Sequence, residues 1–220
     1  MTVNPFGNEL AAEHRRDLIQ QATMHRLAKD AQPPTRHARA TDITVRVRPV
    51  QLEDEPLLAA IFDGLSPASR FARYLAPKRE LSGKELRYFA DIDHHDHEAL
   101  IAVTRSRGEP IGVARFVRDP NDASSADVAI EVVDNWQDRG VGSMLAARLA
   151  ARARSENVTH LTALMAADNR RSQRLLTKMG AVSEVSRDGT TLSYRVALTP
   201  LALVPQQRQG SRLAPAGCPS

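Results

Sequence analysis

Two glycines stand where a helix would be expected to begin, in the stretch DNWQDRGVGSML at residues 134–145. Gly140 and Gly142 follow the strand-like run VAIEVV and precede the helix-like run SMLAARLAARARSE. The first turn of a helix leaves backbone N–H groups without internal partners, and together with the helix dipole these groups attract anions. Glycines at that point would let a phosphate approach the backbone without a Cβ in the way. The spacing therefore indicates a phosphate-binding turn, while a tight turn that uses glycine only for its backbone angles is the alternative.

The turn differs from two common phosphate-binding loops. No Lys-Ser/Thr pair follows Gly142, so the pattern is not a Walker loop, and the third residue after Gly142 is Leu145, so it is not G-x-G-x-x-G. We interpret Trp136, which precedes the turn, as a packing anchor that fixes the loop.

A single carboxylate, Glu131, interrupts the otherwise apolar run VAIEVVD. Burying an unpaired carboxylate is expensive, so its place in a core strand needs a reason. It could accept a proton from an attacking ammonium, directly or through water, and burial makes a carboxyl a better base near neutral pH. It could also lie on the solvent face of a half-buried strand, or pair with an arginine such as Arg115.

The segment DIDHHDHE at residues 91–98 groups three histidines with three aspartates, and such side chains are common metal ligands. The segment falls between a predicted helix and a predicted strand, and we interpret it as a solvated polar loop. No metal is expected. The residues concerned are His94, His95, His97, Asp91, Asp93 and Asp96.

Alternation of apolar and polar residues, and short apolar runs bounded by turns, predict the strands. An Asp188-Gly189 pair predicts a hairpin between the last two. The strands are expected at 43–50, 98–106, 109–119, 125–134 and 160–168, with the hairpin strands within 181–198.

Helical spacing and capping residues predict the helices. Ser66 and Ser82 can cap two of them, with Pro67 in the first turn of the helix after Ser66, and Gly180 is expected at the C-cap of the last. The helices are expected at 52–65, 66–75, 82–92, 140–156 and 169–180. The order of elements predicts an α/β (α+β) domain, a mixed central sheet flanked by helices.

The chain divides into three parts. Residues 1–42 contain a predicted helix at 8–31 and a proline-containing linker, and the helix could dock on the body, pair with another chain or sit loose. Residues 43–198 form the predicted domain. Residues 199–220 are rich in Pro, Gln, Gly and Ala, and we expect a disordered tail.

Composition narrows the class of protein. The chain has 220 residues, of which 42% are hydrophobic and 25% charged, as in a globular domain. Its one cysteine, Cys218, excludes a disulfide framework and fits a reducing compartment. The sequence has no signal core and no run near the roughly 20 apolar residues that span a bilayer, so we expect a cytoplasmic protein without membrane contact. The net charge of +4 is dispersed rather than gathered in a stripe with aromatics, which argues against nucleic acid as a partner.

The glycine turn, together with a later motif, resembles a known superfamily. Residues 137–142, QDRGVG, match the pattern Q/R-x-x-G-x-G/A of the GNAT superfamily of acyl-CoA-dependent N-acetyltransferases. Residues 168–181, DNRRSQRLLTKMGA, resemble its next motif, in which an Asn after the fifth core strand faces the cofactor. Residues 62–103 resemble the GNAT module of bacterial protein lysine acetyltransferases, those linked to acyl-CoA synthetases. The resemblance covers about residues 43–198.

The resemblance implies a GNAT fold that takes acetyl-CoA as co-substrate and needs no metal. It implies that the sheet splays beside the strand before the loop, which would put Val132 and Val133 beside the pantetheine arm, with a backbone N–H near Val133 polarising the thioester carbonyl. It implies Glu131 as the general base. The residues expected to bind the rest of the cofactor are Gln137, Asp138, Arg139, Gly140, Val141, Gly142, Ser143, Asn169 and Ser172.

The chain departs from the family on the acid side. Many GNAT enzymes use a Tyr about seven residues after the Asn to protonate the leaving thiolate, and that position is Leu176 here. Tyr194 is a possible substitute, although a strand residue packed on the sheet is the plainer interpretation. A CoA thiolate is a good leaving group and could also take its proton from water.

We therefore expect transfer of an acetyl group from acetyl-CoA to an amine by direct attack. The favoured acceptor is a protein lysine side chain, with an acyl-CoA synthetase as a candidate partner. The alternatives are a small-molecule amine acetyltransferase and a non-catalytic acyl-CoA sensor or interaction module. The sequence leaves open the acceptor, the acyl chain length, the oligomeric state and the regulation.

Overall fold

The computed structural model describes residues 45–198. The helix predicted at 8–31, the linker after it and the tail predicted from 199 lie outside the described residues. The seven strands and the mixed α/β architecture predicted for the rest are confirmed.

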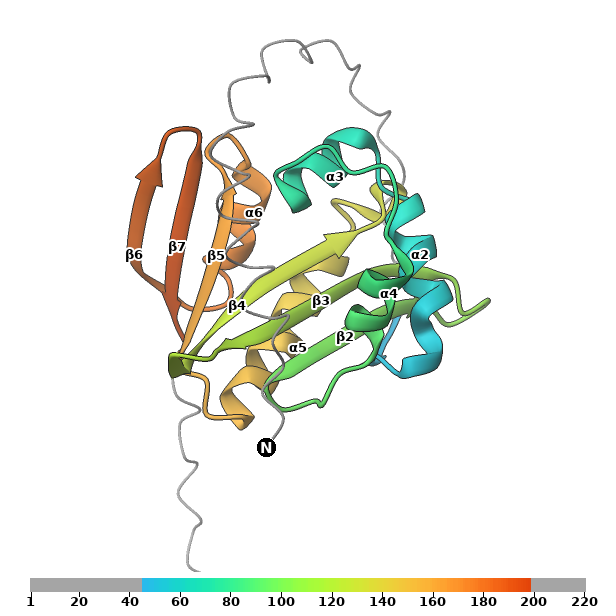
Figure 1. The fold of residues 1–220 in the computed structure, drawn as a ribbon, viewed down its shortest axis with the longest axis horizontal. Helices are drawn as coiled ribbons and strands as arrows, with labels where there is room; N and C mark the ends of the chain where they lie inside the picture. The colour runs from blue at the N-terminus through green and yellow to red at the C-terminus, as the bar shows by residue number, and fades with distance from the viewer. Residues whose placement is uncertain (1–44, 199–220) are drawn as a thin grey trace, which may run out of the picture.

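Seven strands form one sheet in the order β1-β2-β3-β4-β5-β7-β6 (Figure 1). Every neighbouring pair is antiparallel except β4 and β5, which run parallel. The fourth strand begins three residues earlier than predicted. The strands are β1 Val45–Pro49, β2 His97–Thr104, β3 Pro110–Asp119, β4 Asp122–Val132, β5 His160–Ala166, β6 Ala181–Asp188 and β7 Thr191–Ala197.

Helices cover both faces of the sheet, with α2, α3 and α4 on one side and α5 on the other (Figure 1). The predicted caps are confirmed: the Ser66 hydroxyl accepts the Ser69 N–H at 3.2 Å, and Ser82 forms a capping box with Glu85. The helices are α2 Glu55–Asp63, α3 Pro67–Tyr74, α4 Gly83–Ala90, α5 Val141–Ser155 and α6 Arg170–Leu176, with short 3-10 turns at Leu52–Asp54 and Asp134–Trp136.

The strand β2 separates two hydrophobic cores, and all eight of its residues are buried. Leu100 and Ala102 face the core under α5, whereas Ala99, Ile101 and Val103 face the core under α2 and α4. A strand covered on both faces reads as a continuous apolar run rather than an alternating one, which explains the sequence ALIAV.

The sheet opens between β4 and β5. These strands pair only where residues 125–127 meet residues 160–162, and Figure 1 shows them diverging beyond that point. The second half of β4, residues 128–132, therefore pairs with β3 on one side and faces an opening on the other.

The prediction that Gly180 closes the last helix is wrong. The helix α6 ends at Leu176, with Thr177 as its C-cap, because the following N–H groups of Lys178 and Met179 turn back to carbonyls only three residues earlier. Gly180 serves instead as a point of close approach, since a Cβ there would lie 2.2 Å from the backbone oxygen of Ala197.

We expect Gly180→Ala to lower the free energy of unfolding by about 3 kcal/mol, because the added methyl group meets backbone that cannot move aside cheaply. Urea denaturation measures the change. The control is Gly83→Ala in the first turn of α4, where a Cβ meets nothing within 4 Å. That control should stay within about 0.5 kcal/mol of the parent, and equal losses in both variants would contradict the assignment.

Candidate functional site

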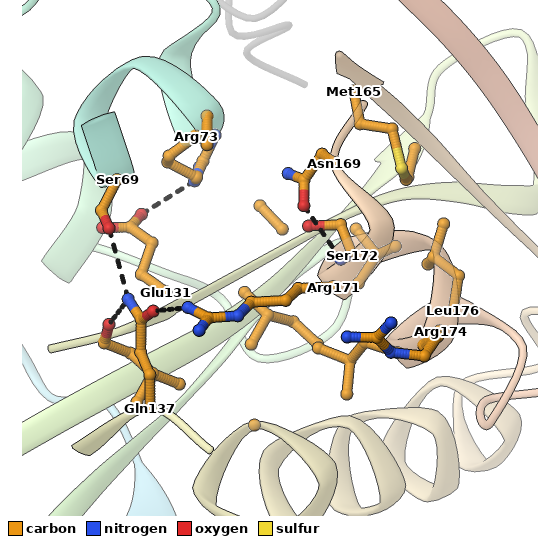
Figure 2. Close-up of a pocket in the computed structure, with 18 of the residues that line it drawn as sticks. Ser69, Arg73, Glu131, Gln137, Met165, Asn169, Arg171, Ser172, Arg174 and Leu176 are labelled. Atoms are coloured by element: carbon orange, nitrogen blue, oxygen red, sulfur yellow. Dashed lines mark hydrogen bonds and ion pairs between the residues drawn. The ribbon is translucent and has the colours of Figure 1, made fainter. Parts of the chain in front are cut away.

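A cavity of about 610 Å³ lies in the opening between β4 and β5 (Figure 2). The α3 helix supplies one wall, the second half of β4 and the glycine turn the next, and α6 the opposite one. Figure 2 shows Arg73 and Glu131 facing each other on one side, with Asn169, Ser172 and Leu176 on the other.

The glycine turn presents the start of α5 to this cavity. The first intrahelical bond runs from the Met144 N–H to the Gly140 oxygen at 3.0 Å, so the N–H groups of the preceding three residues have no partner in the helix. Gly140 has a φ of 86°, a left-handed conformation that favours glycine. For Gly140, the backbone alone thus accounts for the residue type.

Gly142 is different, because neither its backbone nor its neighbours demand a glycine. Its φ is not positive, and a Cβ there would meet Leu175 and Val132 at 3.6 and 3.7 Å, which are ordinary contacts. Gly142 also lines the cavity. The missing side chain leaves room for a ligand rather than for the protein, and this favours the phosphate interpretation of the turn.

The Gln137 side chain ties the walls of the cavity together (Figure 2). Its Nε2 lies 3.0 Å from the Val132 oxygen, 3.0 Å from Asp134 Oδ1 and 3.3 Å from the Ser69 hydroxyl, and its Oε1 accepts from Arg171. One amide therefore links β4, the loop, α3 and α6.

The backbone of β4 corrects the expectation for Val133. Its N–H donates to the Ile111 oxygen at 3.0 Å and so points into the sheet, and its side chain packs in the core under α2 and α4. Because N–H directions alternate along an antiparallel strand, the N–H that faces the opening is that of Val132. Val132, not Val133, lies on the cavity.

Most of the predicted binding residues meet at this cavity. Three do not line it: Val133, the buried Val141, and Arg139, whose guanidinium lies 5.1 Å from the centre of the Trp136 ring. Trp136 itself packs against the core under α5. The predicted residues that line the cavity are Glu131, Val132, Gln137, Asp138, Gly140, Gly142, Ser143, Asn169 and Ser172.

Asn169 has a structural role as well as a place in the lining. Its Oδ1 accepts the Ser172 N–H at 3.1 Å and caps α6. An asparagine after β5 therefore fixes the start of the helix that forms the far wall.

Glu131 is only 7% exposed, which excludes the solvent-face alternative. Its carboxylate pairs with Arg73 of α3, with Nε 2.9 Å from Oε1, rather than with Arg115 (Figure 2). The alternative of an arginine-paired carboxylate is therefore confirmed with Arg73 as the partner, and the paired carboxylate still lines the cavity.

A layer of buried polar side chains lies behind Glu131. Burial lowers the pKa of Arg115 to about 10, with the charge of Glu131 opposing the shift, and the guanidinium lies 4.1 Å from the centre of the Phe89 ring. Burial, and then the charge of Glu131, raises the pKa of Tyr74. Among residues 45–198, Tyr74 Oη, His97 Nε2 and Arg115 Nε have no hydrogen-bond partner.

Sequence reasoning missed the basic side chains of the lining. Arg171 pairs with Asp138 at 2.7 Å, and Lys178 Nζ lies 3.0 Å from the Ser143 hydroxyl. Arg171, Arg174 and Lys178 are three and four residues apart, a spacing that places them on one side of a helical segment and could have signalled them. Arg73 had no comparable signal, because only the fold brings α3 to Glu131.

Among the described residues, no tyrosine lines the cavity to protonate the leaving thiolate. Leu176 is buried and lines the cavity at the position where the resemblance would place a tyrosine. Tyr194 of β7 packs against the core under α5 and does not line the cavity.

The histidine-rich segment holds the start of β2 to α5. His94 Nδ1 lies 2.8 Å from Glu98, and His95 Nδ1 lies 2.5 Å from Glu156. His97 departs from the solvated-loop prediction, since it is the first residue of β2 and 9% exposed, and its ring centre lies 5.1 Å from that of Tyr88. Within the described part of the chain, no three His, Cys, Asp or Glu side chains are grouped to hold a metal ion.

None of the helices between residues 45 and 198 has the length and apolar character needed to cross a membrane.

Residues 44–182 match the family model described as an acetyltransferase (GNAT) domain. Acetyltransferase Pat of Mycolicibacterium smegmatis is 32% identical over 136 residues, which is 62% of this chain and 39% of that protein. The chain thus spans about two fifths of this relative. An acetyltransferase of Pseudomonas aeruginosa is 27% identical over 157 residues, covering 70% of this chain and 84% of the relative.

Solved acetyltransferase and acyltransferase structures superpose on this chain. The GNAT domain of S. lividans PAT superposes with a TM-score of 0.64 at 28% identity, covering 70% of this chain and 90% of that one. A cAMP-binding acyltransferase from Mycobacterium smegmatis gives a TM-score of 0.50 at 26% identity, over 76% of this chain and 51% of that one.

We expect His97 to make the free energy of unfolding depend on pH. Burial, and then the charge of Arg115, lowers its pKa from 6.5 to about 3. Below pH 6.5 the unfolded chain therefore binds a proton that the folded chain refuses, and we expect the free energy of unfolding to fall by about 2 kcal/mol between pH 7 and pH 5. Urea titrations at both pH values measure this fall. His97→Asn should flatten the dependence, and an unchanged slope in that variant would rule out His97 as its source.

Proposed function

The chain belongs to the GNAT acetyltransferase family, and from this premise we propose that it transfers the acetyl group of acetyl-CoA to a primary amine, with a protein lysine side chain as the favoured acceptor. The observation that carries the proposal is that the first turn of α5, the open edge of β4 and Glu131 line one cavity. We further propose that residues 43–198 form the acetyltransferase domain.

The glycine turn would hold the diphosphate of CoA. The unpaired N–H groups at the start of α5 supply donors, and the absent side chain at Gly142 supplies room. Arg171 and Lys178 flank the turn, and the diphosphate would replace Asp138 and Ser143 as their partners.

The pantetheine arm would lie along residues 128–132 of β4, like a strand added to an open edge. The Val132 N–H faces this opening, so it, and not the Val133 N–H, would polarise the thioester carbonyl.

In the chemical step, an alkylammonium gives one proton to Glu131, and the free amine attacks the thioester carbonyl carbon. The C–S bond then breaks, and the second proton leaves nitrogen as the amide forms and ends on the CoA sulfur. No acidic side chain stands at position 176 to deliver that proton, so it travels through solvent. One amide and one thiol form, and Glu131 returns its proton to water.

Support for a protein lysine as acceptor comes from the resemblance of residues 62–103 to the GNAT module of bacterial protein lysine acetyltransferases. An acyl-CoA synthetase as the protein that carries this lysine belongs to the same proposal. A small-molecule amine is the other acceptor class, and mass spectrometry of lysates incubated with labelled acetyl-CoA separates the two.

We expect Gly142→Ala to weaken acetyl-CoA binding at least 10-fold, because its methyl group would occupy the space of the diphosphate. The free energy of unfolding should change by no more than about 0.5 kcal/mol, since the Cβ makes ordinary protein contacts. Calorimetric titration with acetyl-CoA measures the affinity. Gly83→Ala is the matched control in another helix's first turn, and an unchanged affinity in Gly142→Ala would remove the diphosphate from this turn.

We expect Glu131→Gln to lower kcat by about 10²- to 10⁴-fold, because the variant cannot accept the proton. The affinity for acetyl-CoA should stay within a factor of about three, since the carboxylate is not needed to hold the cofactor. Release of free CoA thiol, followed with a thiol reagent, measures turnover. Glu184→Gln on the exposed strand β6 is the control. Full activity in Glu131→Gln would exclude Glu131 as the base, and absence of turnover in the parent would favour a non-catalytic acyl-CoA sensor.

A further inference from the structure

Arg73 occupies a cation-binding position beside the proposed base. Its guanidinium is held by two features, the Glu131 carboxylate 2.9 Å away and the Tyr74 ring, whose centre lies 4.9 Å from the guanidinium carbon. A carboxylate next to an aromatic face is a general recognition device for alkyl cations. Both Arg73 and Glu131 line the cavity, so a ligand in the cavity can reach the same position.

While this pair is intact, Arg73 covers the Oε1 side of the Glu131 carboxylate, so an ammonium cannot bind there. An arginine guanidinium stays charged in proteins and gives no proton away. It also neutralises the carboxylate that should attract the acceptor. An acceptor ammonium that binds Glu131 at Oε1 must take the position that Arg73 now fills.

The surrounding charges favour exchange over addition. Arg115 is buried on the neighbouring strand and its charge and that of Glu131 influence each other, so two guanidiniums already lie within electrostatic reach of one carboxylate. An added ammonium would place a third cation around a single carboxylate in a poorly solvated site, which is unfavourable. An ammonium that replaces Arg73 leaves the charge balance unchanged.

Arg73 is the exchangeable member of the two cations. Its side chain is 23% exposed, whereas Arg115 is 5% exposed and inserted over Phe89. Arg73 lies one residue before the end of α3, and the cavity side of that helix carries Ala68, Ser69 and Ala72. Small side chains along this wall leave space for the guanidinium to move aside.

We propose that Arg73 is a specificity-determining residue that holds the place of the acceptor's ammonium, so that the site accepts flexible primary alkylammonium groups and disfavours amines that are uncharged at neutral pH, such as arylamines. The proposal rests on the proposed function in one respect, namely that Glu131 receives the acceptor's proton. It adds that the acceptor enters as a cation and must displace Arg73.

The first test is Arg73→Ala, assayed with acetyl-CoA and N-acetyl-lysine amide, whose free amine is the acceptor. We expect KM for the amine to fall at least fivefold, because no internal cation competes, while the affinity for acetyl-CoA stays unchanged. Aniline should remain a poor acceptor of the parent. Arg70→Gln is the control, because Arg70 lies on the same helix as Arg73. Its guanidinium binds the backbone oxygens of Leu65 and Arg79 and not Glu131. An equal fall of KM in Arg70→Gln would assign the effect to a loosened α3 and overturn the proposal.

The second test asks whether an added cation refills the position. Guanidinium chloride at millimolar concentration should inhibit Arg73→Ala competitively with the amine and leave the parent unaffected, an effect that a purely structural role of Arg73 would not produce. Equal responses of the two proteins would overturn the proposal.

A third measurement separates this inference from the proposed function. NMR titration with guanidinium should show saturable binding near Glu131 in Arg73→Ala and none in the double variant Arg73→Ala/Glu131→Gln. If the parent transfers no acetyl group but this binding is seen, the proposed function fails and the cation position stands. If the parent transfers acetyl groups but Arg73→Ala shows neither binding nor a lower KM, only this inference fails.

Discussion

The short parallel pairing of β4 with β5 is the constraint on which the rest of the site depends. Residues 125–127 are the only part of β4 in register with β5, and a longer ladder would have used the backbone groups that now face the cavity. Because α5 follows β4 through the glycine turn, the divergence also leaves the start of that helix open to a ligand. The glycine turn, a free strand edge and a buried carboxylate thus occur together because one ladder stops early.

The alternation of side chains along residues 128–132 of β4 then gives the two faces of the strand different roles. Glu131 shares its sheet face with Val113 and Arg115 and meets α3, whereas Val132 and Ile130 face the core under α5. A ligand lying along the edge of β4 therefore meets the backbone over its whole length, but it meets the carboxylate only from the α3 side. The acceptor is accordingly expected to arrive from the α3 side, past Arg73.

The helices, the strands and part of the candidate site could be predicted from the sequence alone. Strong periodicity, caps at Ser66 and Ser82 and the Asp188-Gly189 turn are local signals, so the strands and helices they predict are confirmed. The prediction for Gly180 is wrong because its reason is a contact with Ala197, seventeen residues away in the chain and invisible to any local rule. The glycine turn and Asn169 are likewise local motifs. The Arg73–Glu131 pair joins residues 58 positions apart, and the direction of the Val133 N–H follows from strand register, so neither can be derived from spacing.

The charge of the cavity offers a physical reason why a tyrosine is dispensable at position 176. The lining carries four basic side chains, Arg73, Arg171, Arg174 and Lys178, against the two carboxylates of Glu131 and Asp138. Transfer from a thioester produces a thiolate, and an excess of fixed positive charge lowers the free energy of an anion formed in a partly enclosed site. The proton that a tyrosine would donate stabilises the same leaving group by a different means. Because the diphosphate would take Arg171 and Lys178, the cations left to favour departure of the sulfur as an anion would be Arg174 and Arg73, once Arg73 is displaced from Glu131. A leucine could then stand at position 176 at little cost to the reaction.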